Sequence, residues 1–408
     1  MELREPSAKY LAKPAYKQTE VGVIPAEWEL THLGAHGATY GGLTGKTKKD
    51  FETGEALFVP FMNVISNVVI DCDSFKHVHV ASTESQNCVL QNDLLFNGSS
   101  ETPEEVAFGS VQLASIPSLF LNSFCFGYRL RDGKRIDALF LAYLFRSRPG
   151  REFVKALAQG STRYNISKKA LLSAQLSLPP LPEQRAIAAA LSDVDALLDG
   201  LDRLIAKKRD LKQAAMQQLL TGQTRLPGFS GEWEVKRLGE IAHIKTGGRN
   251  NEDKIADGEY PFFVRSESVE RINSYSHDCE AILVPGEGRI GDIFHYINGK
   301  FDVHQRVYAI TQFKPGISGK FIHLYMAMNF GAWAMQNTVK ATVDSLRLPT
   351  FQTFEMRVPP VKDEQTAIAA VLSDMDAEIS ALVARRDKTR DLKQAMMQEL
   401  LTGRTRLV

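Results

Sequence analysis

Cysteine is scarce in this sequence of 408 residues, and its few cysteines are scattered. None stands in the CxxC spacing of a zinc site, and the nine histidines show no metal-ligand spacing either. We therefore expect no metal site and no disulfide framework. The four residues expected to be free thiols that pack as small apolar side chains are Cys72, Cys88, Cys125 and Cys279.

Long apolar runs and an excess of one charge are also missing. No run approaches the roughly 18 residues that span a bilayer, and Met1 to Glu20 contain no apolar stretch of a signal peptide. We expect a cytoplasmic protein. The net charge of +1 means that any binding to nucleic acid must depend on local separation of charge.

Familiar catalytic motifs are absent as well. Residues 40–47 resemble a phosphate-binding loop, but Tyr40 stands where that loop requires glycine. The sequence has no GxSxG, HExxH, EF-hand loop or dinucleotide fingerprint. It also lacks the Asn-Pro-Pro-aromatic signature of adenine methyltransferases, because each Pro-Pro follows leucine or valine. These absences indicate a recognition protein that is not an enzyme on its own and has no catalytic residues.

What the chain does contain is a repeat. Residues 184–226 align without a gap to residues 365–407, and both copies contain AIAA, LSD, DLKQA, LLTG and TRL. A shorter match precedes each copy, where residues 24–34 resemble residues 229–239 around a shared Glu-Trp-Glu. The bodies between these segments share almost no sequence. We infer one scaffold that carries two unlike modules.

Each repeated segment is expected to form one long helix. Residues 183–220 contain no proline and one glycine, with Pro-Pro before them and Thr-Gly after them. Apolar residues recur at alternating steps of four and three, which is typical of a coiled-coil seam. The first seam is Ile187, Leu191, Val194, Leu198, Leu201 and Ile205, and the second is Ile368, Leu372, Met375, Ile379 and Leu382.

Two similar seams in one chain favour mutual packing. An antiparallel pair would place the bodies at opposite ends, related by an approximate two-fold axis, and the helices would act as a ruler. The alternative is that each helix packs only on its own domain, the usual fate of an apolar stripe. Acidic residues at the start of the first helix and basic residues near both helix ends suit the helix dipole without any function.

The two bodies are predicted to be mixed domains of short strands and helices. Residues 57–70 and 118–130 are β-prone, whereas residues 138–146, 151–158, 320–328 and 333–340 favour helices. The expected fold class is α+β, with two mixed α/β domains joined by two long antiparallel coiled-coil helices. The expected boundaries are 1–178 for the first domain, 179–224 for the central helix, 225–358 for the second domain and 359–408 for the distal helix.

Polar and basic loops connect the predicted strands at related places in both bodies. Arginine, lysine, asparagine and serine are the side chains that reach phosphates and base edges. The candidates for DNA contact are Lys46, Lys48, Lys49, Asn97, Ser99, Ser100, Arg163, Tyr164 and Asn165 in the first body, and Lys245, Arg249, Arg265, Glu287, Arg289, Arg306 and Arg347 in the second. Any one of these loops could instead be an ordinary solvated turn.

Glu287 and Arg289 form a further suggestive pair among these candidates. A carboxylate can accept a hydrogen bond from the cytosine amino group, while a guanidinium donates to guanine. The simpler interpretation is a local ion pair on the surface.

The order of motifs resembles a known family. It runs YKxTExGxIPxEW (residues 16–28), a body, PPLPEQRAIAAxL (179–191), LLTGxTRLPGF, a second body and PPxxxEQxAIA. This order is similar to that of the specificity subunits of type I restriction-modification systems, over essentially the whole chain. One departure is an extra residue between Pro359-Pro360 and Glu364, which affects the expected geometry of the second helix start.

The resemblance implies that each body reads one half of a bipartite site in double-stranded DNA and that the helices set the spacer. It implies two modification subunits as partners, which methylate adenine with S-adenosylmethionine. Restriction subunits that use ATP and Mg²⁺ are implied partners where they are present. This chain itself would bind no cofactor.

Two other classes of function stay open at this point. One is an enzyme whose active site is not recognisable in the sequence. The other is a coiled-coil adaptor that binds proteins and never DNA, which the near-neutral charge permits.

Overall fold

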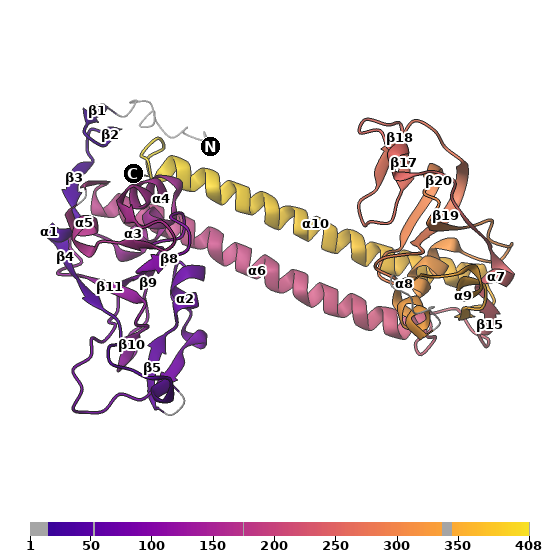
Figure 1. Cartoon of the computed structure of the whole chain (residues 1–408), viewed down its shortest axis with the longest axis horizontal. Helices are drawn as coiled ribbons and strands as arrows, with labels where there is room; N and C mark the ends of the chain where they lie inside the picture. The colour runs from indigo at the N-terminus through magenta and orange to yellow at the C-terminus, as the bar shows by residue number, and fades with distance from the viewer. Residues whose placement is uncertain (1–14, 52–53, 174, 337–344, 408) are drawn as a thin grey trace, which may run out of the picture. The chain divides into compact units, whose positions relative to one another are not determined.

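The structure is a computed structural model that describes residues 15–51, 54–173, 175–336 and 345–407 (Figure 1). The chain divides into two compact units. Unit 1 comprises Met1–Leu201 with Arg385–Val408, and unit 2 comprises Asp202–Ala384. Each unit is therefore a mixed α/β body together with parts of two long helices. Among the described residues, no helix has the length and apolar character needed to cross a membrane.

The two repeated segments are helices α6 (Leu181–Leu220) and α10 (Lys362–Leu400). Helix α6 begins two residues earlier than predicted, because a proline such as Pro182 is tolerated in the first turn, where no N–H is needed. Thr-Gly follows α6 directly and α10 after one further residue, and Gly222 and Gly403 have φ values of +74° and +71°. This left-handed conformation favours glycine and ends the helix.

A glutamine anchors the first turn of each long helix to its own body. The amide of Gln184 donates to the carbonyl oxygens of Pro179 and Arg135 and accepts from the N–H of Asp137, at 2.8–2.9 Å. Gln365 makes the same three kinds of contact with Pro359, Gly316 and Ser318, at 2.8–3.0 Å. The extra residue of the second copy therefore leaves this anchoring intact.

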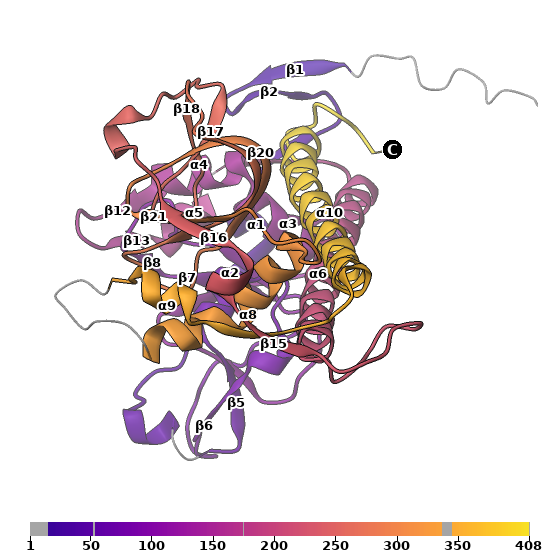
Figure 2. The same cartoon turned by 90° about the vertical axis from the view of Figure 1, so that its right-hand side faces the viewer.

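Within each unit, the local parts of α6 and α10 lie side by side (Figures 1 and 2). In unit 1, Lys393 forms an ion pair with Asp195 at 2.5 Å. In unit 2, Lys212 pairs with Asp376 at 2.5 Å, and these two residues are the repeat equivalents of Lys393 and Asp195. Lys208 pairs with Glu378 at 2.6 Å, so the residue numbers rise on one helix as they fall on the other, which makes the segments antiparallel.

The predicted seam residues are all buried or half-buried. Ile187 and Leu191 join a core cluster that contains body residues of unit 1 and also Leu400 from α10. Ile368 and Leu372 join the corresponding cluster of unit 2 with Leu220 from α6. Each helix start thus packs both on its own body and on the end of the other helix, so that features of both predicted alternatives are present.

A buried junction closes each unit beside these helix ends. Arg406 forms an ion pair with Glu183 at 2.5 Å, and Arg225 forms the equivalent pair with Glu364 at 2.5 Å. The junctions differ at one tryptophan. The indole N–H of Trp28 donates to Glu183 at 3.3 Å, whereas the buried indole nitrogen of Trp233 has no hydrogen-bond partner among the described residues.

Over its described residues, the body of unit 1 has five small sheets, with strand orders β1-β2, β10-β5-β6, β4-β11-β7-β9, β12-β13-β8 and β14-β3. Its strands are β1 (Tyr16–Thr19), β2 (Gly22–Pro25), β3 (Glu29–His32), β4 (Gly37–Gly41), β5 (Ala56–Val59), β6 (Lys76–Val78), β7 (Leu94–Asn97), β8 (Ser99–Ser100), β9 (Gly109–Val111), β10 (Leu119–Leu121), β11 (Cys125–Leu130), β12 (Ala158–Gln159), β13 (Tyr164–Ile166) and β14 (Gln175–Leu178). Its helices are α1 (Leu33–His36), α2 (Phe61–Ser66), α3 (Ala138–Arg146), α4 (Arg148–Leu157) and α5 (Lys168–Ser173), with 3-10 turns η1 (Lys48–Phe51) and η2 (Cys72–Ser74).

The body of unit 2 has one six-stranded sheet, ordered β16-β21-β19-β20-β17-β18, and the separate pair β15-β22. Its strands are β15 (Glu234–Arg237), β16 (His243–Thr246), β17 (Tyr260–Phe263), β18 (Glu270–Ile272), β19 (His277–Pro285), β20 (His295–Val303), β21 (Val307–Thr311) and β22 (Glu355–Val358). Its helices are α7 (Leu238–Ile241), α8 (Gly319–Gln336) and α9 (Leu348–Gln352), with the 3-10 turn η3 (Asn251–Asp253).

The two bodies share a framework that their sequences do not reveal. The antiparallel order β4-β11-β7-β9 in unit 1 corresponds to β16-β21-β19-β20 in unit 2. A parallel pair then follows in both, β5 with β10 and β17 with β20. The main difference is that β20 is one continuous strand, whereas its counterpart in unit 1 is broken into β9 and β10.

Two predictions about local structure are wrong. Residues 57–70 form β5 and then helix α2, because Pro60 has no N–H to extend the strand and directly precedes the helix. Residues 320–328 and 333–336 belong to a single helix, α8, and residues 337–340 lie outside the described residues. The helix predicted at 138–146 is confirmed as α3.

Candidate functional site

One corner of the unit 1 framework gathers five of the predicted contact residues. After β7, the N–H of Gly98 donates to the carbonyl of Phe124 at 2.9 Å, and its own carbonyl accepts from Ile166 at 3.3 Å. These bonds place β8 beside β13, with Ser99 opposite Asn165. The residues brought together at this corner are Ser99, Ser100, Arg163, Tyr164 and Asn165.

Arg163 and an aromatic residue form the exposed part of this corner. The Nε of Arg163 donates to the hydroxyl of Ser99 at 3.1 Å, and its guanidinium lies 5.8 Å from the ring centroid of Phe124. Phe124 is 59% exposed, which is unusual for so large an apolar side chain. The sequence does not single out Phe124, because residues 118–130 are β-prone as a whole, whereas in the structure Phe124 lies between β10 and β11.

Unit 2 builds the same corner with the same backbone contacts. The N–H of Gly286 donates to the carbonyl of Arg306 at 2.8 Å, and the carbonyl of Gly286 accepts from Leu346 at 2.7 Å. Glu287 pairs with Ser345 in an isolated antiparallel bridge. Glu287 therefore occupies the position of Ser99, and Arg306 occupies that of Phe124.

The side chains at this second corner are charged. The carboxylate of Glu287 lies between two guanidiniums, 3.1 Å from Arg306 and 3.4 Å from Arg265. The predicted partner Arg289 instead pairs with Glu267 and Asp292, each at 3.4 Å. The expected pairing of Glu287 with Arg289 is thus corrected. Glu287 instead has two other arginine partners, which lie in the loops after β17 and before β21.

A histidine lies next to these charges. The Nδ1 of His304 accepts from the backbone N–H of Arg306 at 3.0 Å, which leaves the ring proton on Nε2 in the neutral form. Burial, together with the positive charges of Arg265 and Arg306, lowers the pKa of His304. His304, Arg265 and Glu287 line a hollow of about 390 Å³.

Three further candidates in unit 2 lie around this corner or on the sheet that carries it. Arg249 donates to Asp302 at 3.1 Å and to Ser274 at 3.0 Å, so its guanidinium holds its loop against the sheet. Arg347 is exposed and directly follows Leu346, the residue bonded to Gly286. Lys245 is exposed on the edge strand β16.

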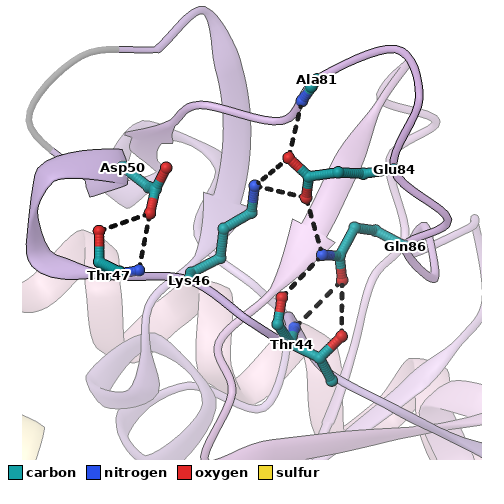
Figure 3. Close-up of polar contacts among 7 residues, drawn as sticks. All are labelled: Thr44, Lys46, Thr47, Asp50, Ala81, Glu84 and Gln86. Carbon is teal, nitrogen blue, oxygen red and sulfur yellow. Dashed lines mark hydrogen bonds and ion pairs between the residues drawn. The ribbon is translucent and has the colours of Figure 1, made fainter.

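Lys46 does not serve as an open DNA contact. Its ammonium lies between the two carboxylate oxygens of Glu84, at 2.6 and 2.7 Å, and its side chain is only 4% exposed (Figure 3). Hydrogen bonds from Lys46, Gln86 and the backbone of Ala81 lower the pKa of Glu84 to about 2. The carboxylate of Glu84 neutralises the charge of Lys46, and this ion pair joins the two loops that carry these residues. Lys46 therefore has a structural role.

Lys48 and Lys49 are exposed, but they lie on η1 and not at the corner. The neighbouring Asp50 accepts from the backbone of His79 at 2.6 Å, which places η1 beside β6. These lysines therefore belong to a second surface of unit 1.

Asn97 is also corrected to a structural role. Its side chain is fully buried at the end of β7. The amide nitrogen donates to the carbonyls of Ser99 and Glu105, and the amide oxygen accepts from Phe108 at 2.7 Å. These hydrogen bonds occupy both the nitrogen and the oxygen of the amide and hold the loop before β9 in place. The side chain of Asn97 therefore cannot reach a base edge.

Over the part of the chain that the structure describes, no group of three or more histidine, cysteine, aspartate or glutamate side chains is arranged to hold a metal ion. Ser99 is buried, whereas Arg163 and Asn165 in unit 1 and Arg265 and Arg306 in unit 2 are exposed hydrogen-bond donors. Such an arrangement suits contact with an extended partner.

Comparisons with known proteins agree with the repeat. The family described as type I restriction modification DNA specificity domain matches residues 44–207 and 230–388. The chain is 25% identical to a putative type I restriction enzyme MjaX specificity subunit of Methanocaldococcus jannaschii, over 96% of this chain and 97% of that protein. It is 30% identical to the type I restriction enzyme EcoDI specificity subunit of Escherichia coli, over 42% of this chain and 37% of that protein.

Solved structures resemble the fold over nearly the whole chain. The S subunit of a type I restriction-modification system from M. genitalium has a TM-score of 0.61 at 16% identity, covering 95% of this chain and 99% of that one. A chain from a structure described as the structural basis of complex assembly and conformational transition of the type I R-M system has a TM-score of 0.56 at 17% identity, covering 93% of this chain and 99% of that one.

Proposed function

The chain belongs to the family of type I restriction-modification DNA specificity domains, and on this basis we propose that each of its two bodies reads one half of a bipartite site in double-stranded DNA. The observation that carries the proposal is the repeated corner. The same backbone contacts place Ser99 and Phe124 at the corner of one unit and Glu287 and Arg306 at the corner of the other. A constant frame with exchangeable side chains is what two different sequence specificities require.

The chemistry of the two corners supports binding to DNA. Arginine, serine and asparagine side chains can donate to phosphates and to base edges in the major groove. Arg163 and Asn165 are exposed in unit 1, and Arg265, Arg306 and Arg347 are exposed in unit 2. This local concentration of basic residues supplies an electrostatic attraction that the net charge of +1 does not suggest.

The long helices are proposed to form an antiparallel coiled coil that sets the length of the unspecified spacer. Helix α6 has 40 residues, which corresponds to about 60 Å of helix at the usual rise per residue. The two readers would be residues 1–178 and 225–358, and the helical segments 179–224 and 359–408. Linking two weak readers in one chain makes the second binding event intramolecular and raises the overall affinity.

Catalysis is proposed to reside in partner subunits. Two modification subunits would dock on the helices and methylate adenine with S-adenosylmethionine, and restriction subunits, where present, would use ATP and Mg²⁺. This chain contributes recognition and assembly and binds no cofactor itself.

The test of DNA recognition uses the chain assembled with its modification subunits. We expect tight binding to one bipartite sequence, with a binding constant that falls steeply as salt rises, because phosphate contacts release counterions. A complex that assembles but binds all DNA equally weakly, or none, would contradict the proposal and favour a protein-only adaptor. Methylation by the purified chain without partners would instead reveal an unrecognised enzyme.

The spacer proposal has its own test. Inserting four residues, about one helical turn, at matching places in both α6 and α10 should change the spacer length found by methylome sequencing and leave both half-sites unchanged. The same insertion in the exposed turn at residues 132–134 serves as the control and should leave the spacer unchanged. An altered half-site sequence after the helix insertions would refute this role.

A further inference from the structure

We infer that Arg265 and Arg306 are specificity-determining residues of unit 2 that donate to guanine, and that Glu287 is the positioning residue that holds their guanidiniums in place. The inference rests on the proposed function and extends it to the chemistry of one half-site. It predicts at least one G·C pair in the half-site that unit 2 reads.

The first step is the geometry of the carboxylate. The Oε1 of Glu287 contacts Arg306 at 3.1 Å, and its Oε2 contacts Arg265 at 3.4 Å. The Glu287 side chain is 24% exposed, whereas those of Arg265 and Arg306 are 53% and 59% exposed. The carboxylate thus lies below two guanidiniums that face solvent.

The second step decides which residue touches DNA. Both carboxylate oxygens of Glu287 already accept from arginine, so the carboxylate is poorly placed to accept from a cytosine amino group as well. Each arginine uses one terminal nitrogen for Glu287, and a guanidinium has five N–H donors. The arginines therefore keep donors for a ligand, while Glu287 fixes their direction.

The third step is the choice of base. A guanidinium held in a fixed plane can donate two hydrogen bonds to O6 and N7 of guanine, the commonest specific contact in the major groove. Prior orientation matters because an arginine that is already held loses less side-chain entropy on binding. Ion pairs this exposed contribute little to the stability of the fold. The main effect of the carboxylate is therefore to orient the two guanidiniums.

The equivalent corner of unit 1 supplies an internal comparison. There Ser99 stands in the place of Glu287 and Phe124 in the place of Arg306. The single guanidinium of Arg163 is held by a hydroxyl and an aromatic ring, and no carboxylate among the described residues pairs with it. The same backbone positions thus carry different chemistry, as expected of positions that determine specificity.

The experiment sequences the methylome of a host that expresses the full chain with its modification subunits, comparing the wild type with R306K, R265K and E287Q. Lysine keeps the positive charge and removes the bidentate fork. We expect R306K and R265K each to reduce the preference for guanine at one position on the order of tenfold or more. E287Q should reduce the preference for guanine wherever those two variants do, because it releases both arginines.

The matched control is R237K. Arg237 lies on β15, away from the corner, and its similarly exposed side chain also pairs with a carboxylate, that of Glu355. It should leave both half-sites unchanged. In every variant the half-site read by unit 1 should stay intact, which also reports that the chain is folded and assembled.

Three outcomes would overturn the inference. The first is a unit 2 half-site without a G·C pair, and the second is an unchanged half-site in R306K, R265K and E287Q. The third is loss of all methylation in R306K although the complex assembles, since a relaxed reader should broaden the site and not abolish it. A wild-type chain that specifies no bipartite site would defeat the proposed function as well, so the two failures can be told apart.

Discussion

Units 1 and 2 have the same frame and differ in what the frame presents. Both have a two-stranded pair beside a short Leu-Gly helix, β3-β14 with α1 and β15-β22 with α7. Both anchor a long helix through one glutamine and close with a buried arginine–glutamate pair. The repeated sequence is concentrated at these positions, where contacts with the helices restrict the side chains.

The difference lies in the middle of each body. Unit 2 has a continuous strand β20 that joins its sheet, whereas unit 1 has a break between β9 and β10. The corners then carry Ser99 and Phe124 in one unit and Glu287 and Arg306 in the other. Conserved contacts at the junction thus leave the exposed loops free to differ.

The largest effect is expected at the buried ion pairs of the junctions. R406A should leave Glu183 buried without its partner and destabilise unit 1 by about 3–5 kcal/mol. R225A should act on unit 2 through Glu364 in the same way. Hydrogen exchange of the full-length chain measures the opening free energy of each unit separately. R404A, which removes an exposed side chain 3.8 Å from Glu399, is the control and should change stability by less than about 0.5 kcal/mol.

The two tryptophans should contribute differently to the stability of the two junctions. W28F removes the hydrogen bond from the indole to Glu183, which contributes about 1.5–3 kcal/mol because the acceptor is charged. W233F removes an indole whose buried nitrogen has no hydrogen-bond partner in the described chain. We therefore expect W28F to destabilise unit 1 more than W233F destabilises unit 2. Equal losses, measured by hydrogen exchange, would show that the indole bond is not what distinguishes them.

The helix-ending glycines provide a smaller contrast. Both require φ above zero, so alanine is strained at either position. A Cβ at Gly403 would lie 2.5 Å from Pro25 and 3.0 Å from Trp28, whereas one at Gly222 would come no closer than 3.2 Å to Trp233. G403A should therefore cost about 1 kcal/mol more than G222A. Thermal unfolding with hydrogen exchange of each junction tests the order, and a reversed order would contradict it.

The smallest effect is expected at the pairs between the helices. Asp195 accepts from both Lys393 and the hydroxyl of Tyr143, and it is less exposed than Asp376, the partner of Lys212. Double-mutant cycles should give about 0.2–1 kcal/mol for each pair, with the larger value for Asp195 and Lys393. A larger value for Lys212 and Asp376 would mean that Tyr143 does not hold Asp195 in place.

Local signals explain which parts of the fold could be predicted. Proline before the helices and glycine after them predict the bounds of α6 and α10, with a difference of two residues at the start of α6. The correspondence between the two bodies could not be predicted. It depends on pairing between distant strands, which unlike side chains can support equally well.

The site residues show the same limit. Lys46 is neutralised by Glu84 and Glu287 is held by Arg265, and both partners come from loops remote in sequence. Asn97 looks like a polar loop residue in the sequence, yet the backbone of the next loop surrounds it. Residue type thus predicts what a side chain can bind, while tertiary contacts decide whether it is available.

The central claim is that each unit reads its own half-site. The most direct measurement is methylome sequencing after residues 234–358 are replaced by the corresponding body of another family member, with both long helices left intact. The account predicts that one half-site changes while the other half-site and the spacer stay the same. A change in both half-sites, or in neither, would contradict it.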